Sequence, residues 1–198
     1  MTWRDRALKR TFDIVLAASG LLLLWPVIGV TWWLAARDTG AGGFFRQSRI
    51  GRFGTPFQVV KIRTMRATEG GTTVTTKNDA RITPLGAKLR RWKLDELPQL
   101  WNVLVGEMSF VGPRPDVPGF MDALEGRDRD LLELRPGITG PATLKYRDEE
   151  EILAAQPDPE RYNAEVIWPD KVAINCAYLR DYSLRRDLGY IWRTVRGG

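Results

Sequence analysis

The sequence predicts an α+β fold that is mostly helical and that attaches to a membrane through its amino-terminal segment. Three observations support this prediction: a long uncharged apolar run near the amino terminus, two short strand-like segments around a glycine-rich turn, and a series of amphipathic helical segments after them. We expect two parts. Residues 1–40 form the membrane helix with its flanks, and residues 41–198 form one integrated folded unit.

Composition limits the chemistry that this chain can perform. Its 198 residues suffice for one domain with a real core, and its formal net charge of +6 favours anionic partners such as nucleic acid, anionic lipid or phosphorylated substrates. It has no histidine, which excludes Ser–His and Cys–His nucleophile pairs and imidazole metal sites. With Cys176 as its single cysteine it forms no intrachain disulfide.

The apolar run extends from Ile14 to Ala36 without a charged residue, and about 20 such residues can cross a bilayer. Basic residues lie on both flanks, and positive charge favours the cytoplasmic side. Pro26 removes a backbone donor, so we predict a helix broken at Trp25-Pro26. The residues alone leave two topologies open: a re-entrant helix with both ends on one face, and a proline-kinked span.

Short elements follow the membrane segment. Phe44–Arg49 and Pro56–Arg63 are predicted strands of a hairpin, and residues 67–80 a loop. The last helical segment, Leu184–Val195, is amphipathic and basic, which fits either a helix lying on the membrane surface or one packed on the core. The predicted helices are Leu85–Trp92, Leu97–Val105, Asp122–Leu134, Glu149–Ala155, Ala164–Leu179 and Leu184–Val195.

The pair Asp95-Glu96 is the strongest candidate for catalysis. Acidic residues are also favoured in a first helical turn by the helix dipole, and from the residues alone that structural explanation is slightly favoured. In the catalytic interpretation, adjacent carboxylates point about 100° apart on a helix, so one attacks or binds metal while the other handles a proton or the metal shell.

Basic residues on stiff backbone lie near this pair in the sequence. Lys61 and Arg63 alternate along a predicted strand and therefore share a face, and Arg114 lies between two prolines. Such cations favour a preorganised clamp for phosphate oxygens. Arg90 and Arg91, one helical turn before the pair, and Arg135, before Pro136-Gly137, complete the set.

These motifs resemble the bacterial sugar transferase family, also called small monotopic phosphoglycosyl transferases. The similarity covers nearly the whole chain, and the order and spacing of its motifs make it specific. The matching stretches are Lys9-Arg10 with Phe12-Asp13, Gln47 to Gly54, Lys61 to Met65, Asp79 to Thr83, Leu94 to Leu100, Phe110 to Pro115, and Arg135 to Gly140.

The resemblance implies a reaction in which Asp95 attacks the β-phosphate of a UDP-sugar, UMP leaves, and a polyprenol phosphate such as undecaprenyl phosphate takes up the phospho-sugar. It implies Glu96 as the partner of Asp95 and Mg²⁺ held by both. It also implies a monotopic, re-entrant helix on the cytoplasmic face of the bacterial inner membrane. The substrate contacts that we carry over are Lys61, Arg63, Arg90, Arg114, Pro115, Arg135, Gly137 and Thr139.

Two positions depart from the family pattern. Trp25 replaces the usual serine before the helix-breaking proline, and Asn175 stands where many members have an acidic residue, so Asn175 is left out of the catalytic set. A non-catalytic membrane scaffold of a polysaccharide assembly complex is the alternative function, and the intact Asp95-Glu96 motif favours the enzyme. A nucleic-acid binder is disfavoured because much of the charge flanks the membrane run. The sugar, the pathway and a homo-oligomer are left open.

Overall fold

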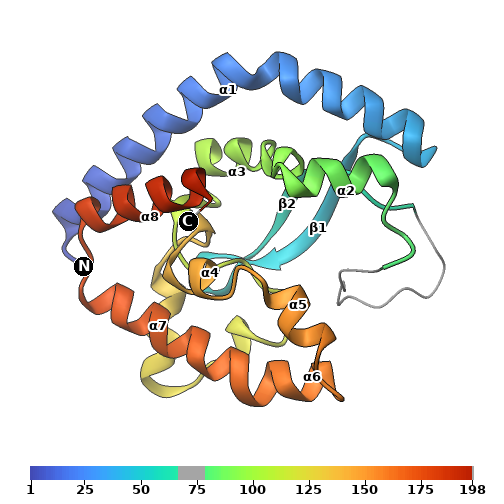
Figure 1. Cartoon of the computed structure of the whole chain (residues 1–198). Helices are drawn as coiled ribbons and strands as arrows, with labels where there is room; N and C mark the ends of the chain where they lie inside the picture. Colours follow the sequence, from blue (N-terminus) through green and yellow to red (C-terminus); the bar gives the residue numbers. More distant parts are fainter. Residues whose placement is uncertain (67–78, 198) are drawn as a thin grey trace.

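The computed structural model describes residues 1–66 and 79–197, so most of the loop predicted for residues 67–80 lies outside the described residues. The fold is mostly helical, with a small two-stranded sheet and one long apolar amino-terminal helix, as predicted. This helix, α1 (Trp3–Thr39), arches over α3 (Gln99–Val105), as Figure 1 shows. The hairpin lies beneath its carboxyl-terminal part and α8 (Leu184–Arg196) beside its amino-terminal part.

Helix α1 is continuous, so the predicted break at Trp25-Pro26 is wrong. A capping box between Thr2 and Asp5 begins the helix, and Gly40 in the left-handed conformation ends it. Pro26 lies inside it and costs one backbone hydrogen bond, while the remaining bonds of a 37-residue helix keep it intact. The chain bends instead of breaking, and Figure 1 shows α1 as an arch.

Both halves of α1 are fastened to the same folded unit. Near the amino terminus, Lys9 Nζ lies 2.6 Å from Asp187 Oδ2, and this pair is buried. Near the other end, Ala35 packs with Ile62 and Leu89. The opposite side of α1 exposes large apolar side chains, and α1 is the one helix in the described ranges that is long and apolar enough to cross a membrane.

The predicted hairpin is confirmed. Strands β1 (Phe44–Ile50) and β2 (Pro56–Ile62) pair antiparallel around a short 3₁₀ turn, η1 (Arg52–Gly54). Phe45 lies directly opposite Lys61, so these two side chains share one face of the hairpin.

The helical predictions after the hairpin are confirmed in part. The predicted helix Asp122–Leu134 is wrong, because this stretch forms two 3₁₀ segments, η3 (Met121–Ala123) and η4 (Gly126–Glu133). The helix predicted from Leu97 is preceded by a 3₁₀ turn, η2 (Leu94–Glu96), and begins at Gln99. The other helices are α2 (Pro84–Arg91), α4 (Pro141–Lys145), α5 (Glu149–Ala154), α6 (Pro159–Tyr162), the short π-helix η5 (Asn163–Ile167), α7 (Trp168–Arg180) and α8.

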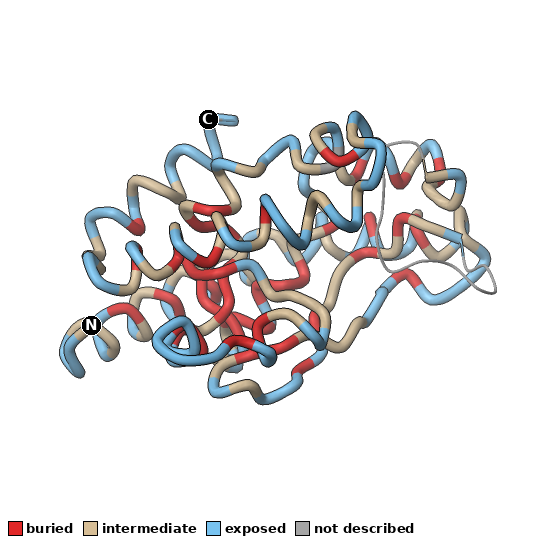
Figure 2. Tube along the Cα trace, turned by 90° about the horizontal axis from the view of Figure 1, so that it is seen from below, coloured by how far each residue is buried: buried red, intermediate tan, exposed pale blue. Residues whose placement is uncertain are grey.

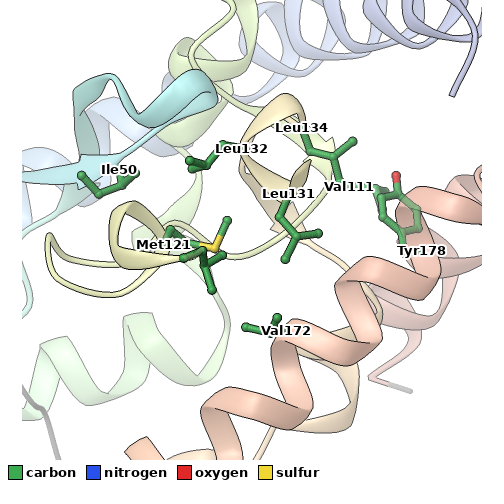
Figure 3. Close-up of a cluster of buried hydrophobic side chains, with 9 residues drawn as sticks. Ile50, Val111, Met121, Leu131, Leu132, Leu134, Val172 and Tyr178 are labelled. Carbon is green, nitrogen blue, oxygen red and sulfur yellow. The ribbon is translucent and has the colours of Figure 1, made fainter. Parts of the chain in front are cut away.

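The largest apolar cluster lies between the 3₁₀ segments and α7, where Leu131 is fully buried and packs near Val172 and Tyr178 (Figure 3). Figure 2 shows buried residues gathered in the interior while the outer sides of the helices are exposed. Because η3 contributes Met121 and η4 contributes Leu131 and Leu132 to this cluster, both segments have a fixed position despite their irregular backbone.

A second, parallel strand pair was not predicted. Strands β3 (Ser109–Val111) and β4 (Gly137–Thr139) have three residues each and bring two glycine-rich loops into contact. A Cβ on Gly112 would lie 2.3 Å from the Arg135 carbonyl oxygen, and one on Gly137 would lie 2.2 Å from the Gly112 nitrogen. Only glycine permits this approach, which fixes the loop that carries Arg114.

Candidate active site

The Asp95-Glu96 pair lies in the 3₁₀ turn η2, between α2 and α3. Lys93, which precedes this turn, has left-handed backbone with φ of 55°, a conformation that costs a non-glycine residue about 1 kcal/mol or more. Leu94 packs against the cluster formed by Ala35, Ile62 and Leu89, so the turn is held against α1 and β2. The backbone reversal at Lys93 and the packing of Leu94 together position the two carboxylates.

Asp95 is a buried carboxylate with an unsatisfied oxygen. Its side chain is 7% exposed, and Oδ1 has no hydrogen-bond partner among the described residues. Burial, and then the neighbouring charge of Glu96, raises the pKa of Asp95 above its ordinary value. The cations Lys61, Arg90 and Lys93 act in the opposite direction and favour the ionised form. A desolvated anion surrounded by cations is suited to act as a nucleophile.

Glu96 is held by two cations. Its Oε1 accepts hydrogen bonds from Lys61 Nζ at 3.0 Å and from Arg114 Nη2 at 2.9 Å. Burial opposes the charge of Glu96, but Arg114 and Lys61 outweigh that cost and lower its pKa below the ordinary range. Glu96 therefore stays ionised beside Asp95. Lys61 from β2, Glu96 from η2 and Arg114 from the loop after β3, all singled out in the sequence, meet here.

Arg90 and Arg63 have positions that the sequence did not specify. Arg90 Nε donates to Thr64 Oγ1 at 3.0 Å, and its charge lowers the pKa of Asp95, so it lies on the dyad side of α2. Arg63 instead donates from Nε to the Gly42 carbonyl at 2.7 Å and from Nη2 to the Phe44 carbonyl at 3.1 Å. Arg63 therefore fixes the start of β1, two residues beyond Lys61 on the same face.

The other predicted substrate contacts lie farther along the chain. Arg135 Nε donates to the Gly106 carbonyl at 2.8 Å, at the end of α3 opposite the dyad. Thr139 is buried, with its Oγ1 2.6 Å from Thr194 Oγ1 on α8. Gly137 packs on Gly112, and the Pro115 carbonyl accepts a bond from Arg49 at 3.3 Å. The structure thus gives Arg135, Gly137 and Thr139 structural contacts, and their role as substrate contacts stays a prediction.

Sequence reasoning missed Asp116 and Arg49 at this site. Burial raises the pKa of Asp116 to about 6, although Lys171, Arg49 and Arg114 oppose that shift. Asp116 follows the Arg114-Pro115 pair directly, and an acidic residue so close to a proposed phosphate clamp was the available signal. Asn175, left out earlier, is buried on α7 with its Oδ1 unsatisfied among the described residues.

The dyad has the donor chemistry for a hard divalent cation. In the described ranges no group of three or more acidic, Cys or His side chains gathers into a protein-only metal site. Mg²⁺ commonly binds through one or two carboxylates and completes its shell with substrate phosphates and water. The unsatisfied Oδ1 of Asp95 beside ionised Glu96 fits such a partial site.

Comparisons with known proteins identify the family of this chain. The profile of the bacterial sugar transferase family matches residues 4–197. The chain belongs to the bacterial sugar transferase family. This confirms the resemblance read from the motifs of the sequence.

Several curated relatives of this family member are named for their reactions. The UDP-glucose:undecaprenyl-phosphate glucose-1-phosphate transferase of Escherichia coli (strain K12) is 36% identical over 98% of this chain and 40% of its own length. The enzyme of the same name from Caulobacter vibrioides is 35% identical over 94% of this chain and 68% of its own length. The UDP-galactose-lipid carrier transferase of Erwinia amylovora is 32% identical over 96% of this chain and 40% of its own length. The chain thus spans about two fifths of the E. coli and Erwinia relatives.

Proposed function

We propose that this sugar transferase moves a sugar-1-phosphate from a UDP-sugar to undecaprenyl phosphate, with release of UMP, through a covalent intermediate on Asp95. The observation that carries the proposal is the pairing of a buried, unsatisfied Asp95 with a Glu96 that Lys61 and Arg114 hold in place. A purely structural dyad at a helix start would be solvated and capped, whereas this one is desolvated and faces a cluster of cations.

The proposed reaction has two displacements at phosphorus. In the first, a carboxylate oxygen of Asp95 forms a bond to the β-phosphorus of the donor, the bond from that phosphorus to the bridging oxygen breaks, and UMP leaves with the electron pair. In the second, a phosphate oxygen of undecaprenyl phosphate attacks the same phosphorus and the Asp95–phosphorus bond breaks. The products are UMP and undecaprenyl diphosphate sugar, and Asp95 is regenerated as a carboxylate.

The cations around the dyad make the first displacement feasible. A carboxylate is repelled by a diphosphate, so the donor charge must be neutralised before attack. Arg114 keeps part of its side chain exposed while it holds Glu96, and the charge of Arg90 acts on Asp95. We assign donor-phosphate contacts to Arg114 and Arg90, and orientation of Glu96 to Lys61. Asp95 and Glu96 would hold Mg²⁺, which when bound supplies further neutralisation of the diphosphate charge.

We further propose that α1 enters and leaves one membrane face, with the rest of the chain on the cytoplasmic side of the bacterial inner membrane. A straight helix of 37 residues would be about 55 Å long, and a spanning helix would carry its two ends to opposite faces. Instead, Lys9 near one end and Ala35 near the other both contact the same folded unit. The arch places η2 next to α1, which would hold the dyad at the depth of a lipid phosphate.

The deciding experiment measures UMP release from a panel of UDP-sugars by protein in detergent with Mg²⁺ and undecaprenyl phosphate. We expect acceptor-dependent UMP from one or two donors and none from Asp95→Asn. Asp122→Asn, in an exposed 3₁₀ turn, is the matched control and should retain activity. Release of UDP would contradict the proposal, because it means glycosyl transfer. Silence from folded protein across the panel would favour the scaffold.

A further inference from the structure

A shallow cavity of about 470 Å³, largely open to solvent, lies where the carboxyl-terminal part of α1 meets the start of β1. Its lining residues are Trp32, Gly42, Phe44, Phe45, Arg46 and Arg63. Gly43 makes this junction narrow, because a Cβ there would lie 2.1 Å from the Trp32 carbonyl oxygen. The volume falls in the range of small-molecule sites, about 300–1,000 Å³.

The lining is divided between aromatic rings and cations. The rings of Trp32 and Phe44 lie 6.2 Å apart, and both residues are more than a third exposed beside the apolar surface of α1. Arg46 and Arg63 supply two guanidinium groups, and the lining includes no carboxylate. Aromatic walls with uncompensated cations suit a molecule that joins an apolar chain to an anionic head.

Arg63 is held in place before any ligand binds. Its two bonds to the carbonyls of Gly42 and Phe44 use two of its five N–H groups, and the guanidinium lies 5.8 Å from the centre of the Phe45 ring. The remaining N–H groups can donate to an anion without first ordering the side chain. Arg46 is exposed and also lines the cavity, and because it follows Phe45 on the strand it supplies a second cation from the other face of β1.

The register of the hairpin connects this cavity to the reacting carboxylates. Phe45 lies opposite Lys61, and Arg63 follows Lys61 by two residues, so all three side chains share one face. Two strand positions correspond to about 7 Å. Lys61 in turn donates to Glu96. The cavity therefore joins Trp32 of the apolar helix α1 to Arg63, which lies two residues along the chain from Lys61.

We propose that this cavity binds the lipid acceptor, with its phosphate on Arg46 and Arg63 and its first isoprenoid units against Trp32 and Phe44. The inference rests on the proposed function, because it names the place where that acceptor waits beside Asp95. A bulk phospholipid would satisfy the charges equally, but it would have no reason to be held two strand positions from Lys61. The position thus favours the acceptor lipid over other anionic lipids.

The test measures equilibrium binding of radiolabelled undecaprenyl phosphate to protein in phosphatidylcholine nanodiscs, without donor. Arg46→Gln should weaken binding about tenfold, because it removes one charge-assisted contact, and Arg46→Lys should recover part of the loss. Arg127→Gln, an exposed arginine on η4, is the control and should bind normally. Unlabelled undecaprenyl phosphate should displace the label, while undecaprenol and phosphatidylglycerol at the same concentration should not.

Kinetics supply the second readout. In Arg46→Gln, the KM for undecaprenyl phosphate should rise about tenfold, while the KM for the donor and the single-turnover release of UMP without acceptor stay unchanged. Displacement by phosphatidylglycerol, equal weakening in Arg127→Gln, or a change confined to the donor KM would each overturn the assignment. Because binding requires no turnover, the result is independent of Asp95: activity retained in Asp95→Asn would refute the proposed mechanism and leave the binding measurement intact.

Discussion

At the scale of single residues, two adjacent carboxylates differ because their surroundings differ. Glu96 has two cationic partners and a lowered pKa, whereas Asp95 has an unsatisfied oxygen and a raised one. Lys61 contributes to both through one ammonium group. Lys61 on β2 and Arg114 in the loop after β3 both bond Glu96. The different tasks of the two carboxylates therefore follow from this choice of partner.

Lys61→Met should destabilise the protein and slow the reaction. Glu96 would keep only Arg114, and a buried carboxylate that loses a partner costs about 1–3 kcal/mol. Denaturant unfolding in detergent micelles, followed by Trp fluorescence, measures the free energy of unfolding. The exposed Lys88→Met on α2 is the control, with an expected change within about 0.5 kcal/mol. Equal effects in both variants would mean that the Lys61–Glu96 bond contributes nothing.

Asp116 gives a pH-dependent prediction. Its pKa is about 6 in the folded protein, above the ordinary value of 3.8, so its ionisation opposes folding as the pH rises through that window. Asp116→Asn should therefore raise the free energy of unfolding relative to the native protein at about pH 7.5, by up to about 3 kcal/mol. The gain should shrink towards about pH 4.5, where Asp116 is protonated in the fold. A gain that is independent of pH would contradict the assignment.

At the scale of elements, the buried Lys9–Asp187 pair joins the first helix to the last. Asp187 also accepts a bond from Tyr178 at 2.7 Å, so α1, α7 and α8 meet at one carboxylate. Lys9→Met should lower the free energy of unfolding by about 3–5 kcal/mol, because it leaves a buried charge with only the tyrosine. The same unfolding measurement tests it.

A double variant separates the pair from simple packing. Lys9→Met combined with Asp187→Asn keeps an acceptor for Tyr178 and removes both charges, so it should cost less than the sum of the single changes. Arg6→Met, one helical turn away, breaks an exposed pair with Glu133 and should cost less than about 1 kcal/mol. Additive single effects would show that the two charges do not act together.

The elements also separate what the sequence could predict from what it could not. The hairpin was predictable because β1 and β2 are adjacent in sequence and Gly51 and Gly54 mark the turn between them. The β3–β4 pair was not, because three-residue strands have no readable period and their parallel pairing depends on distant glycines. The helix predicted over Asp122–Leu134 failed because its leucines are buried by tertiary packing and not by a regular helical face.

The residues of the site also divide into those that the sequence could predict and those that it could not. The motifs singled out Asp95, Glu96, Lys61 and Arg114, the family resemblance implied their roles, and the structure brings these four together. Sequence could not say in which direction a long cationic side chain points. Arg63 and Arg135 satisfy backbone carbonyls of neighbouring loops, a tertiary property that no local pattern encodes.

At the scale of the whole molecule, the arch of α1 makes a prediction about topology. In a Cys176→Ser background, single cysteines at Ala7→Cys and Ala41→Cys flank the membrane run. In intact spheroplasts neither should react with a membrane-impermeant maleimide, and both should react after permeabilisation. Labelling of one position from the outside would mean that α1 spans the membrane. A cysteine known to face the periplasm serves as the positive control.

The Lys9–Asp187 pair between α1 and α8 also has a consequence for the order in which the parts of the protein assemble. Lys9 and Asp187 are 178 positions apart, and ribosomes add about 5–20 residues per second, so the ammonium of Lys9 waits on the order of ten seconds or more for its carboxylate. During that interval α1 has already left the ribosome with its apolar side exposed, and the folded unit that it contacts is still incomplete. Early contact with lipid would shield that side from aggregation, and the arch reaches its final position only after α8 has been synthesised.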